Sequence, residues 1–224
     1  MKKLPDGYAD LVVADPPYGI NRFKNGETSR LRKYGSLESV NNFSFTEEMF
    51  NEMRRISKNQ IIFGFNHLCD VLPPTSEFIF WYKHQPVETY SDGELAWTSF
   101  NKTAKCFDYP FFGSHGADDD KRISPAQKPV ALYKWIYNQY LPNGGAVVDP
   151  FLGSGTASVV AKKLGRRYCG IELNEEYCLW AEKRLHLADS DNSIQGYSDG
   201  VFWERNSLSF QKKQKNAEAN SNQK

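Results

Sequence analysis

A carboxylate, two prolines and a tyrosine stand together in Asp15-Pro16-Pro17-Tyr18, directly after the apolar run 9–14. Proline can neither donate to a sheet ladder nor continue inside a helix, so the chain must leave the sheet here. The Asp15 carboxylate and the rigidly held Pro16 carbonyl can accept both N–H bonds of one exocyclic amino group. The ring of Tyr18 offers a flat face on which a nucleobase can stack. A strand-ending turn is the alternative, but the four residues together favour an amino-group site.

A second candidate site is the glycine-rich turn Phe151-Leu152-Gly153-Ser154-Gly155, between an expected strand and an expected helix. Glycine lets the backbone turn sharply and approach a ligand closely, and the helix start offers unpaired N–H groups. Glu172, at the end of the next expected strand, is placed to accept hydrogen bonds from ribose hydroxyls. A turn with no ligand is the alternative for the glycines alone. Together with Glu172 they indicate a cofactor that carries a nucleoside.

Strands and helices alternate around these two motifs. Apolar and β-branched runs predict strands at 9–14, 60–65, 78–82, 146–149 and 168–172, with a strand-like run at 95–100 in an otherwise irregular stretch. Capping residues and periodicity predict helices at about 46–57, 129–140, 156–164 and 174–187. Thr46 and Asn174 are the expected N-caps, and Pro129 is expected to open its helix. The β-α-β-α order at the carboxyl end is typical of a doubly wound, parallel α/β sheet.

Composition excludes several other classes of protein. The chain has 224 residues, of which 40% are hydrophobic and 25% charged, values typical of one globular domain. No apolar run is long enough to span a membrane, and no secretory signal follows the first lysines, so we expect a cytoplasmic protein with reduced thiols. The cysteines and histidines show no zinc spacing, so no metal site is expected. A net charge of +1 neither indicates nor excludes nucleic acid as a partner.

The two motifs, taken together, resemble those of amino-group DNA methyltransferases that use S-adenosylmethionine. Asp15-Pro16-Pro17-Tyr18 matches the catalytic tetrapeptide of that family, and 149–156 matches its cofactor loop. Pro125-Ala126-Gln127-Lys128-Pro129 matches a further element on the cofactor side, and Gly170-Ile171-Glu172-Leu173 matches the ribose-binding strand end. The tetrapeptide precedes the glycine loop, which is the family's β arrangement. The resemblance implies a Rossmann-like class I methyltransferase fold, circularly permuted, with a doubly wound, mostly parallel sheet of seven strands.

The resemblance also implies the reaction, which is direct methyl transfer to the N6 amino group of an adenine flipped out of double-stranded DNA. Asp15 and the Pro16 carbonyl would accept the amino hydrogens, and Tyr18 would stack on the base. An N4-cytosine enzyme is the main alternative. Asp15 favours adenine because the cytosine enzymes often have serine at that position. An RNA or protein-glutamine target, and an inactive subunit that binds cofactor and recognises DNA, also stay open.

The resemblance and the local patterns together name the expected site residues. The catalytic residues are Asp15, Pro16, Pro17 and Tyr18. The cofactor-binding residues are Gln127, Lys128, Asp149, Phe151, Gly153, Ser154, Gly155, Thr156, Glu172 and Leu173. The basic residues expected to contact DNA phosphates are Arg22, Lys24, Arg30, Arg32 and Lys33.

The expected organisation is a methyltransferase domain over 1–188 with a target-recognition insertion at about 83–123. Residues 189–224 form an extension whose polar end, from about 211, is expected to be disordered. Relatives usually carry a further strand before the catalytic one, whereas eight residues precede Ala9 here. We therefore expect part of the pocket for the cofactor's adenine to be missing or to come from the C-terminal segment. A homodimer and a restriction enzyme as functional partner are both compatible with the resemblance.

Overall fold

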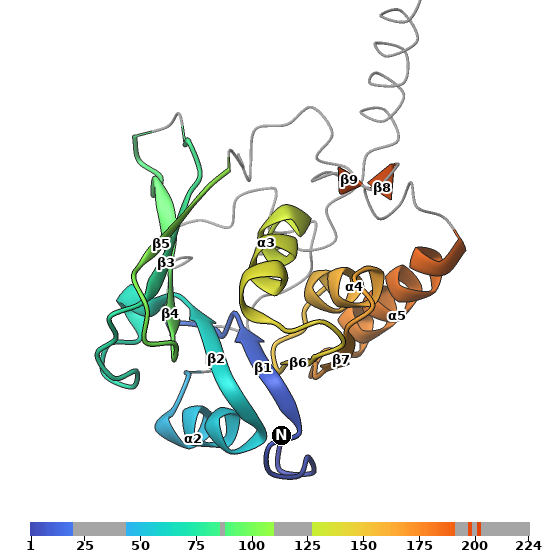
Figure 1. Cartoon of the computed structure of the whole chain (residues 1–224), viewed down its shortest axis with the longest axis horizontal. Helices are drawn as coiled ribbons and strands as arrows, with labels where there is room; N and C mark the ends of the chain where they lie inside the picture. Colours follow the sequence, from blue (N-terminus) through green and yellow to red (C-terminus); the bar gives the residue numbers. More distant parts are fainter. Residues whose placement is uncertain (20–43, 86–87, 110–126, 191–196, 199–200, 203–224) are drawn as a thin grey trace, which may run out of the picture.

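The computed structural model describes residues 1–19, 44–85, 88–109 and 127–190 and two short pairs, 197–198 and 201–202. The described residues contain a seven-stranded sheet in the order β5-β3-β4-β2-β1-β6-β7 (Figure 1). The strands are β1 (Ala9–Ala14), β2 (Ser57–Phe63), β3 (Phe78–Tyr82), β4 (Gly93–Thr98), β5 (Lys105–Asp108), β6 (Ala146–Asp149) and β7 (Arg167–Gly170). Strands β8 (Tyr197–Ser198) and β9 (Val201–Phe202) form a separate antiparallel pair. The expected seven-stranded α/β sheet is confirmed.

Strand β4 is the reversed strand in an otherwise parallel sheet. It runs antiparallel to β2 and β3, whereas β1 is parallel to both β2 and β6, β6 to β7, and β3 to β5. Because β1 and β6 are parallel neighbours, the segments that follow Ala14 and Asp149 leave the sheet at the same edge. From β1 the chain moves to β2 on one side and later returns to β6 on the other side. Open α/β sheets bind ligands at such a switch point.

Helices cover both faces of the sheet (Figure 1). Helix α2 (Glu47–Ile56) packs on one face, and α3 (Val130–Tyr140) and α4 (Thr156–Lys163) pack on the other, with α5 (Glu175–Ser190) beside α4. Alternate residues of β1 enter the two cores, Leu11 and Val13 on the α3 side and Val12 on the α2 side. A strand that is buried on both faces needs a continuous apolar run, which is why β1 was recognisable in the sequence.

Some element boundaries differ from the expected ones. Thr46 caps α2 as expected, since its Oγ1 accepts a hydrogen bond from the Met49 N–H at 3.3 Å. Pro129 is the residue before α3 rather than its first helical residue, because its ψ of 145° is extended. The stretch expected to be irregular contains two strands, β4 and the unexpected β5. Strand β5 lies at the edge of the sheet with most of its residues exposed, so it lacks the apolar run that predicts a buried strand.

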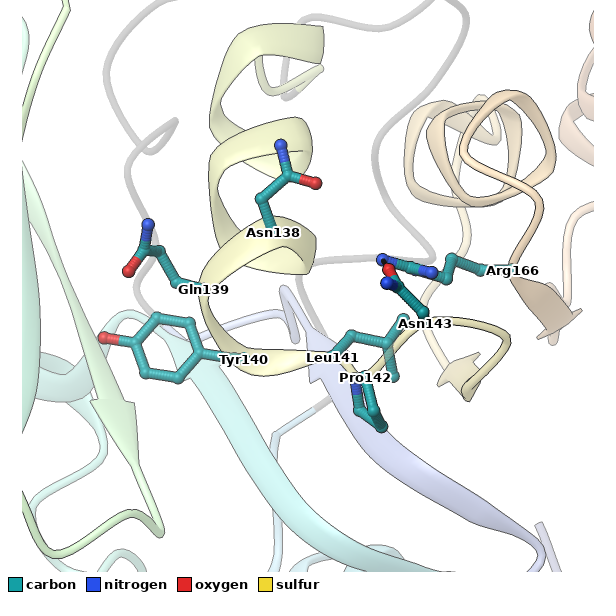
Figure 2. A pocket seen from close by; sticks show the side chains of 7 residues that line it. All are labelled: Asn138, Gln139, Tyr140, Leu141, Pro142, Asn143 and Arg166. Carbon is teal, nitrogen blue, oxygen red and sulfur yellow. Dashed lines mark hydrogen bonds between the residues drawn. The ribbon is translucent and has the colours of Figure 1, made fainter.

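A hollow lies near the amino-terminal end of β6, away from the edge at which β1 and β6 end. It is lined by residues 138–143 and Arg166, from the end of α3, the following turn and the segment before β7 (Figure 2). Within it, the Arg166 guanidinium donates a hydrogen bond to the Asn143 side-chain oxygen at 2.7 Å. Its position separates this hollow from both sequence motifs.

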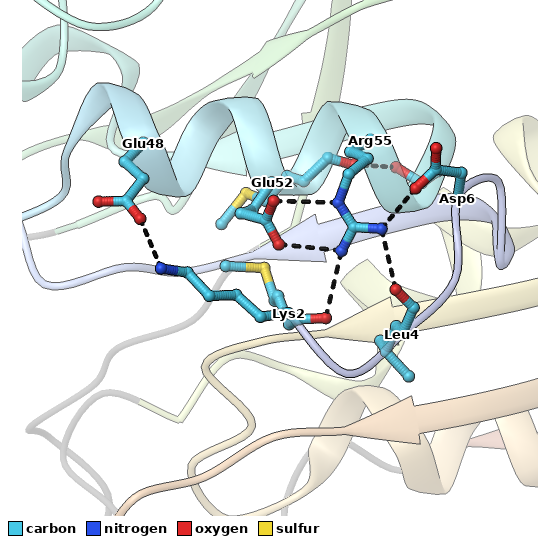
Figure 3. Close-up of polar contacts among 9 residues, drawn as sticks. Lys2, Leu4, Asp6, Glu48, Glu52 and Arg55 are labelled. Carbon is cyan, nitrogen blue, oxygen red and sulfur yellow. Dashed lines mark hydrogen bonds and ion pairs between the residues drawn. The ribbon is translucent and has the colours of Figure 1, made fainter.

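The segment before β1 is tied to α2 by Arg55 (Figure 3). The Arg55 guanidinium donates to the Leu4 carbonyl at 2.9 Å and to the Asp6 carboxylate at 2.6 Å. It also pairs with Glu52, one turn earlier on α2, at 2.9 Å. These contacts fix the approach to β1 and hence the start of the strand that carries the tetrapeptide.

Candidate active site

Asp15 lies just beyond the end of β1, and the tetrapeptide that begins with it leaves the sheet as expected. The Tyr18 hydroxyl donates a hydrogen bond to Asp15 Oδ1, which joins the first and last members of the tetrapeptide. Pro16 between them is buried, whereas Asp15 and Tyr18 are partly exposed. The backbone of Tyr18 forms an isolated β-bridge with Ser44. The carboxylate and the ring are therefore presented together at the sheet edge.

The ring of Tyr18 rests against the turn that follows β2. Gly64 in this turn has a φ of +77°, and a Cβ built on it would lie 2.0 Å from Cε1 of Tyr18. Any larger residue at Gly64 would therefore displace the tyrosine ring. The imidazole of His67 stacks on the same ring, with 5.4 Å between ring centroids. Gly64 and His67 were not among the expected site residues, although a glycine directly after a buried strand is a detectable signal for a close approach.

Lys128, which we expected among the cofactor-binding residues, contacts the Asp15 carboxylate. Its ammonium group donates a hydrogen bond to Asp15 Oδ2 and lies 3.2 Å from a carboxylate oxygen of Glu94 on β4. Glu94 also pairs with Lys83, just after β3. Gln127, the residue before Lys128, points the other way: its side-chain oxygen accepts a hydrogen bond from the Ser154 hydroxyl at 3.3 Å. This short segment before α3 therefore contacts both motifs.

The glycine loop begins at the end of β6, where Asp149 is buried. Asp149 Oδ1 accepts a hydrogen bond from the Phe151 N–H at 3.0 Å, which shapes the turn around Pro150. Gly153 and Gly155 both have positive φ, 52° and 83° respectively. A Cβ on Gly155 would lie 2.7 Å from the Cβ of Ala181 on α5, so this glycine is required for close packing. A Cβ on Gly153 would meet no described atom within 4 Å, so this glycine faces open space.

Glu172 holds the glycine loop. One oxygen of its carboxylate accepts a hydrogen bond from the Gly153 N–H at 2.7 Å, and the other accepts from the N–H groups of Leu173 and Asn174 at 2.8 and 2.9 Å. Strand β7 ends at Gly170, so Glu172 lies beyond the strand rather than at its last position. Asn174 caps α5 as expected, since its side-chain oxygen accepts from the Tyr177 N–H at 3.1 Å.

Arg184 on α5 also supports the glycine loop, and it was not among the expected site residues. Its guanidinium donates to the Ser154 carbonyl at 2.5 Å and to the Thr156 hydroxyl at 3.0 Å. The side chain is buried, and burial lowers its pKa to about 10, so it stays charged at neutral pH. Its spacing from Ala181 is the signal that could have found it, because residues three apart share one helix face.

Carboxylates dominate the electrostatics between the two motifs. Burial raises the pKa of Asp149 to about 7, and the nearby charges of Asp15 and Glu172 act in the same direction. The Phe151 N–H and the Lys128 ammonium oppose that shift. A bound cation would lower the cost of ionising Asp149. The site is therefore suited to a ligand that carries positive charge.

The remaining expectations concern DNA contacts, metals and membranes. The basic residues expected to contact DNA lie outside the described residues, and these are Arg22, Lys24, Arg30, Arg32 and Lys33. Residues 110–123 of the target-recognition stretch also lie outside them. Leu173 is described and is 88% exposed. Among the described residues, no cluster of histidine, cysteine and acidic side chains could hold a metal ion. No helix in the described ranges is both long and apolar enough to cross a membrane.

Comparisons with known proteins agree with this architecture. The chain is 30% identical to the type II methyltransferase M.HinfI of Haemophilus influenzae over an alignment of 249 positions. The alignment covers 87% of this chain and 68% of that protein. It is 26% identical to the type II methyltransferase M.HpaI of Haemophilus parainfluenzae over an alignment of 243 positions. That alignment covers 88% of this chain and 73% of that protein.

Solved structures share the fold. The M1.HpyAVI complex with SAM superposes with a TM-score of 0.53 at 23% identity, covering 83% of this chain and 91% of that one. The PvuII DNA methyltransferase, described as cytosine-N4-specific, gives 0.54 at 16% identity, covering 82% and 81%. A family model described as DNA methylase matches residues 64–183, which include Lys128, the glycine loop and Glu172. The chain therefore belongs to the N6/N4 family of DNA methylases, which use S-adenosylmethionine as methyl donor.

Proposed function

We propose that this chain transfers a methyl group from S-adenosylmethionine to the N6 amino group of adenine in DNA. The position of the Asp15 carboxylate carries this proposal. It is joined to Tyr18 and Lys128 and lies at the edge where β1 ends beside β6 and its glycine loop. An acceptor for amino hydrogens thus stands next to a loop suited to a nucleoside cofactor.

The chemistry needs an amino nitrogen with an available lone pair. S-adenosylmethionine, when bound, supplies an electrophilic methyl group on a positively charged sulfur. Transfer of that methyl group to the nitrogen would leave a neutral thioether, and the proton that the nitrogen gives up would pass by way of the Asp15 carboxylate to water. Asp15 accepts one amino hydrogen and the Pro16 carbonyl accepts the other, which draws the nitrogen lone pair out of conjugation with the ring. Tyr18 stacks on the base after it has left the duplex, and the rate gain comes largely from positioning.

The residues between the two motifs fit the cofactor. Gly153 leaves open space where a ligand can approach the backbone, and the start of α4 offers N–H groups. The carboxylates of Asp149 and Glu172 suit the positive charges and the ribose hydroxyls of the cofactor. We propose that the residues in contact with it are Gln127, Asp149, Phe151, Gly153, Ser154, Gly155, Thr156, Glu172 and Leu173.

DNA contacts are proposed from the sequence alone. The basic residues between the tetrapeptide and α2 would hold phosphates on either side of the flipped base: Arg22, Lys24, Arg30, Arg32 and Lys33. Neutralising the last three together should weaken binding to all DNA sequences alike. The slope of affinity against salt should fall by about one unit per lost phosphate contact.

The N4-cytosine reaction is the second candidate, because both amino groups present the same two hydrogens to Asp15 and Pro16. The PvuII enzyme, which shares the fold, is described as cytosine-N4-specific. Asp15 at the first position of the tetrapeptide favours adenine, as the family resemblance implies. An inactive recognition subunit is disfavoured because the tetrapeptide is intact and its Asp15 and Tyr18 are joined.

Labelled S-adenosylmethionine tests whether the chain is active and whether Asp15 carries the reaction. The wild type should transfer label to unmethylated genomic DNA, whereas Asp15→Ala should transfer none and should still bind the cofactor in calorimetry. Cofactor binding by the wild type without transfer would identify an inactive subunit. Transfer by Asp15→Ala within about tenfold of the wild type would remove Asp15 from the mechanism.

A further inference from the structure

Four charged side chains form a chain of ion pairs that ends at the Asp15 carboxylate. Lys83 pairs with Glu94, Glu94 lies 3.2 Å from Lys128, and Lys128 contacts Asp15. The four residues come from the ends of β3, β4 and β1 and from the segment before α3. Apart from Asp15, none of these groups has a place in the reaction as described above.

The Lys128 ammonium is the most deeply buried member of this chain. Its side chain is 6% exposed and lies over the ring of Phe63, 4.6 Å from the ring centroid. Burial alone would lower the pKa of Lys128, but the charges of Asp15 and Glu94 outweigh burial and raise it. A buried ammonium without such partners would lose its proton. The two carboxylates therefore both favour the charged form of Lys128.

Glu94 is likewise held in its ionised form. Burial would raise its pKa, but the ammonium groups of Lys128 and Lys83 outweigh burial and lower the pKa to about 2. Its Oε2, the oxygen nearest to Lys128, is buried. An ion pair in the core commonly contributes little net stability, because desolvation offsets the attraction. Stability alone therefore does not explain well why Glu94 and Lys128 carry charges beside Asp15.

The ion pairs constrain how Asp15 can meet a target amino group. Asp15 Oδ2 accepts from Lys128, and Oδ1 accepts from the Tyr18 hydroxyl. An ionised carboxylate has about four acceptor sites, so each oxygen keeps one for an amino hydrogen. Lys128 thus fixes the plane of the carboxylate without filling its acceptor sites.

We propose that Glu94 is a positioning residue, which holds the Lys128 ammonium against Asp15 so that the carboxylate is aimed at the amino group of the base. This inference rests on the proposed function, because it takes Asp15 as the acceptor. Lys128 acts through Asp15, and Glu94 acts through Lys128. Lys83 lies at the other end of the series of ion pairs from Asp15 and balances the charge of Glu94.

Glu94→Gln tests the proposal, with kcat measured from pH 6 to 10 at saturating S-adenosylmethionine and saturating unmethylated genomic DNA. Without the Glu94 charge, the pKa of Lys128 falls, so its proton should be lost at lower pH. We expect kcat to fall about tenfold at neutral pH and further as the pH rises, while KM for S-adenosylmethionine stays within about twofold of the wild type. The charged or titratable groups around Lys128 that could shape this profile are Asp15, Tyr18, Lys83, Glu94, Tyr133 and Asp149.

A double-mutant cycle separates a positioning role from a structural one. If Glu94 acts only through Lys128, the double variant with Glu94→Gln and Lys128→Gln should be no slower than Lys128→Gln alone, within about twofold. The double variant removes one charge of each sign and leaves the net charge unchanged, so it provides a second measurement if Glu94→Gln alone fails to fold. Losses that multiply would overturn the proposal, as would a Glu94→Gln enzyme with the kcat and pH profile of the wild type.

Glu77→Gln is the matched control. Glu77 is a fully buried glutamate, and its carboxylate accepts from the Tyr140 hydroxyl at 3.0 Å and the Lys102 N–H at 2.9 Å. This variant should lower the melting temperature and leave the pH profile of kcat unchanged. If kcat of Glu77→Gln also fell as the pH rises, the effect would be a general one of instability. That result would overturn the proposed role of Glu94. Transfer by Asp15→Ala would instead defeat the proposed function itself.

Discussion

Glu172 accepts a hydrogen bond from the backbone N–H of Gly153 at 2.7 Å, so the acid expected to bind ribose also fixes the glycine loop. Its second oxygen accepts from two N–H groups at the start of α5. The carboxylate therefore ties the turn after β6 to the turn after β7. The oxygen that accepts from Gly153 keeps an acceptor site that a ribose hydroxyl can use.

Replacing Glu172 should weaken cofactor binding for two reasons. Glu172→Ala removes both the ribose acceptor and the restraint on Gly153, so S-adenosylmethionine should bind more weakly by roughly 1–3 kcal/mol in calorimetry. Glu175→Ala, an exposed change in the first turn of α5, is the control and should bind normally. Wild-type affinity in Glu172→Ala would show that the carboxylate does not contact the cofactor.

Gly153 and Gly155 should fail in different ways. A Cβ on Gly155 would lie 2.7 Å from Ala181, so Gly155→Ala should lower the melting temperature markedly. A Cβ on Gly153 would meet open space, so Gly153→Ala should cost only about 1 kcal/mol of backbone strain and still fold. Gly153→Val should then exclude the cofactor from a folded protein. Normal cofactor affinity in Gly153→Val would mean that Gly153 serves only the turn.

Removing Arg184 should loosen the cofactor loop without touching the substrate side. Arg184→Met deletes the hydrogen bonds to Ser154 and Thr156 and should lower both the melting temperature and the affinity for S-adenosylmethionine. DNA binding, measured by fluorescence anisotropy, should be unchanged. Lys183→Met, an exposed change on the same helix, should behave as wild type. A stable Arg184→Met protein with full cofactor affinity would contradict a supporting role for this residue.

The buried carboxyl of Asp149 predicts a pH dependence of stability. Burial raises its pKa to about 7, so between about pH 4 and 7 the folded protein holds a proton that the unfolded chain has released. The contribution of Asp149 is therefore greatest at low pH and is lost as the pH rises through 7. Asp149→Asn should be more stable than wild type at pH 8, by about 4 kcal/mol at most, and similar to it at pH 4.

Thermal unfolding at the two pH values checks this expectation, and calorimetry supplies the functional counterpart. S-adenosylmethionine carries positive charge, so its affinity for the wild type should rise as the pH passes through 7 and Asp149 ionises. Asp149→Asn should bind it weakly at both pH values. A pH-independent affinity in the wild type would separate Asp149 from the cofactor.

Sequence reasoning succeeded where a feature depends on neighbouring residues. The apolar run of β1, the prolines after it and the positive-φ glycines after β6 each leave a local pattern. The caps Thr46 and Asn174 were likewise confirmed, because a capping side chain bonds a backbone group three residues away. Order along the chain then placed both motifs at one sheet edge, and the parallel pairing of β1 and β6 confirmed that placement.

Contacts between distant segments could not be predicted in this way. Lys128 lies 113 residues from Asp15 in sequence, and only the sheet order brings its ammonium group to that carboxylate. Glu94 lies on β4, in a stretch that we expected to be mostly irregular. No pattern of neighbouring residues therefore indicated its contact with Lys128. Strand β5 was missed for a different reason, since an exposed edge strand needs no apolar run. The contacts of Lys128 with Asp15 and Glu94 could therefore be found only from the fold.

Identification of the methylated base is the most direct test of methyl transfer to the N6 amino group of adenine. Unmethylated genomic DNA, incubated with the wild-type chain and S-adenosylmethionine carrying a labelled methyl group, would be digested to nucleosides and separated by mass spectrometry. We expect labelled N6-methyladenine from the wild type and none from Asp15→Ala. Label in N4-methylcytosine would contradict the adenine assignment, and label on a ring carbon would contradict the amino-group mechanism itself.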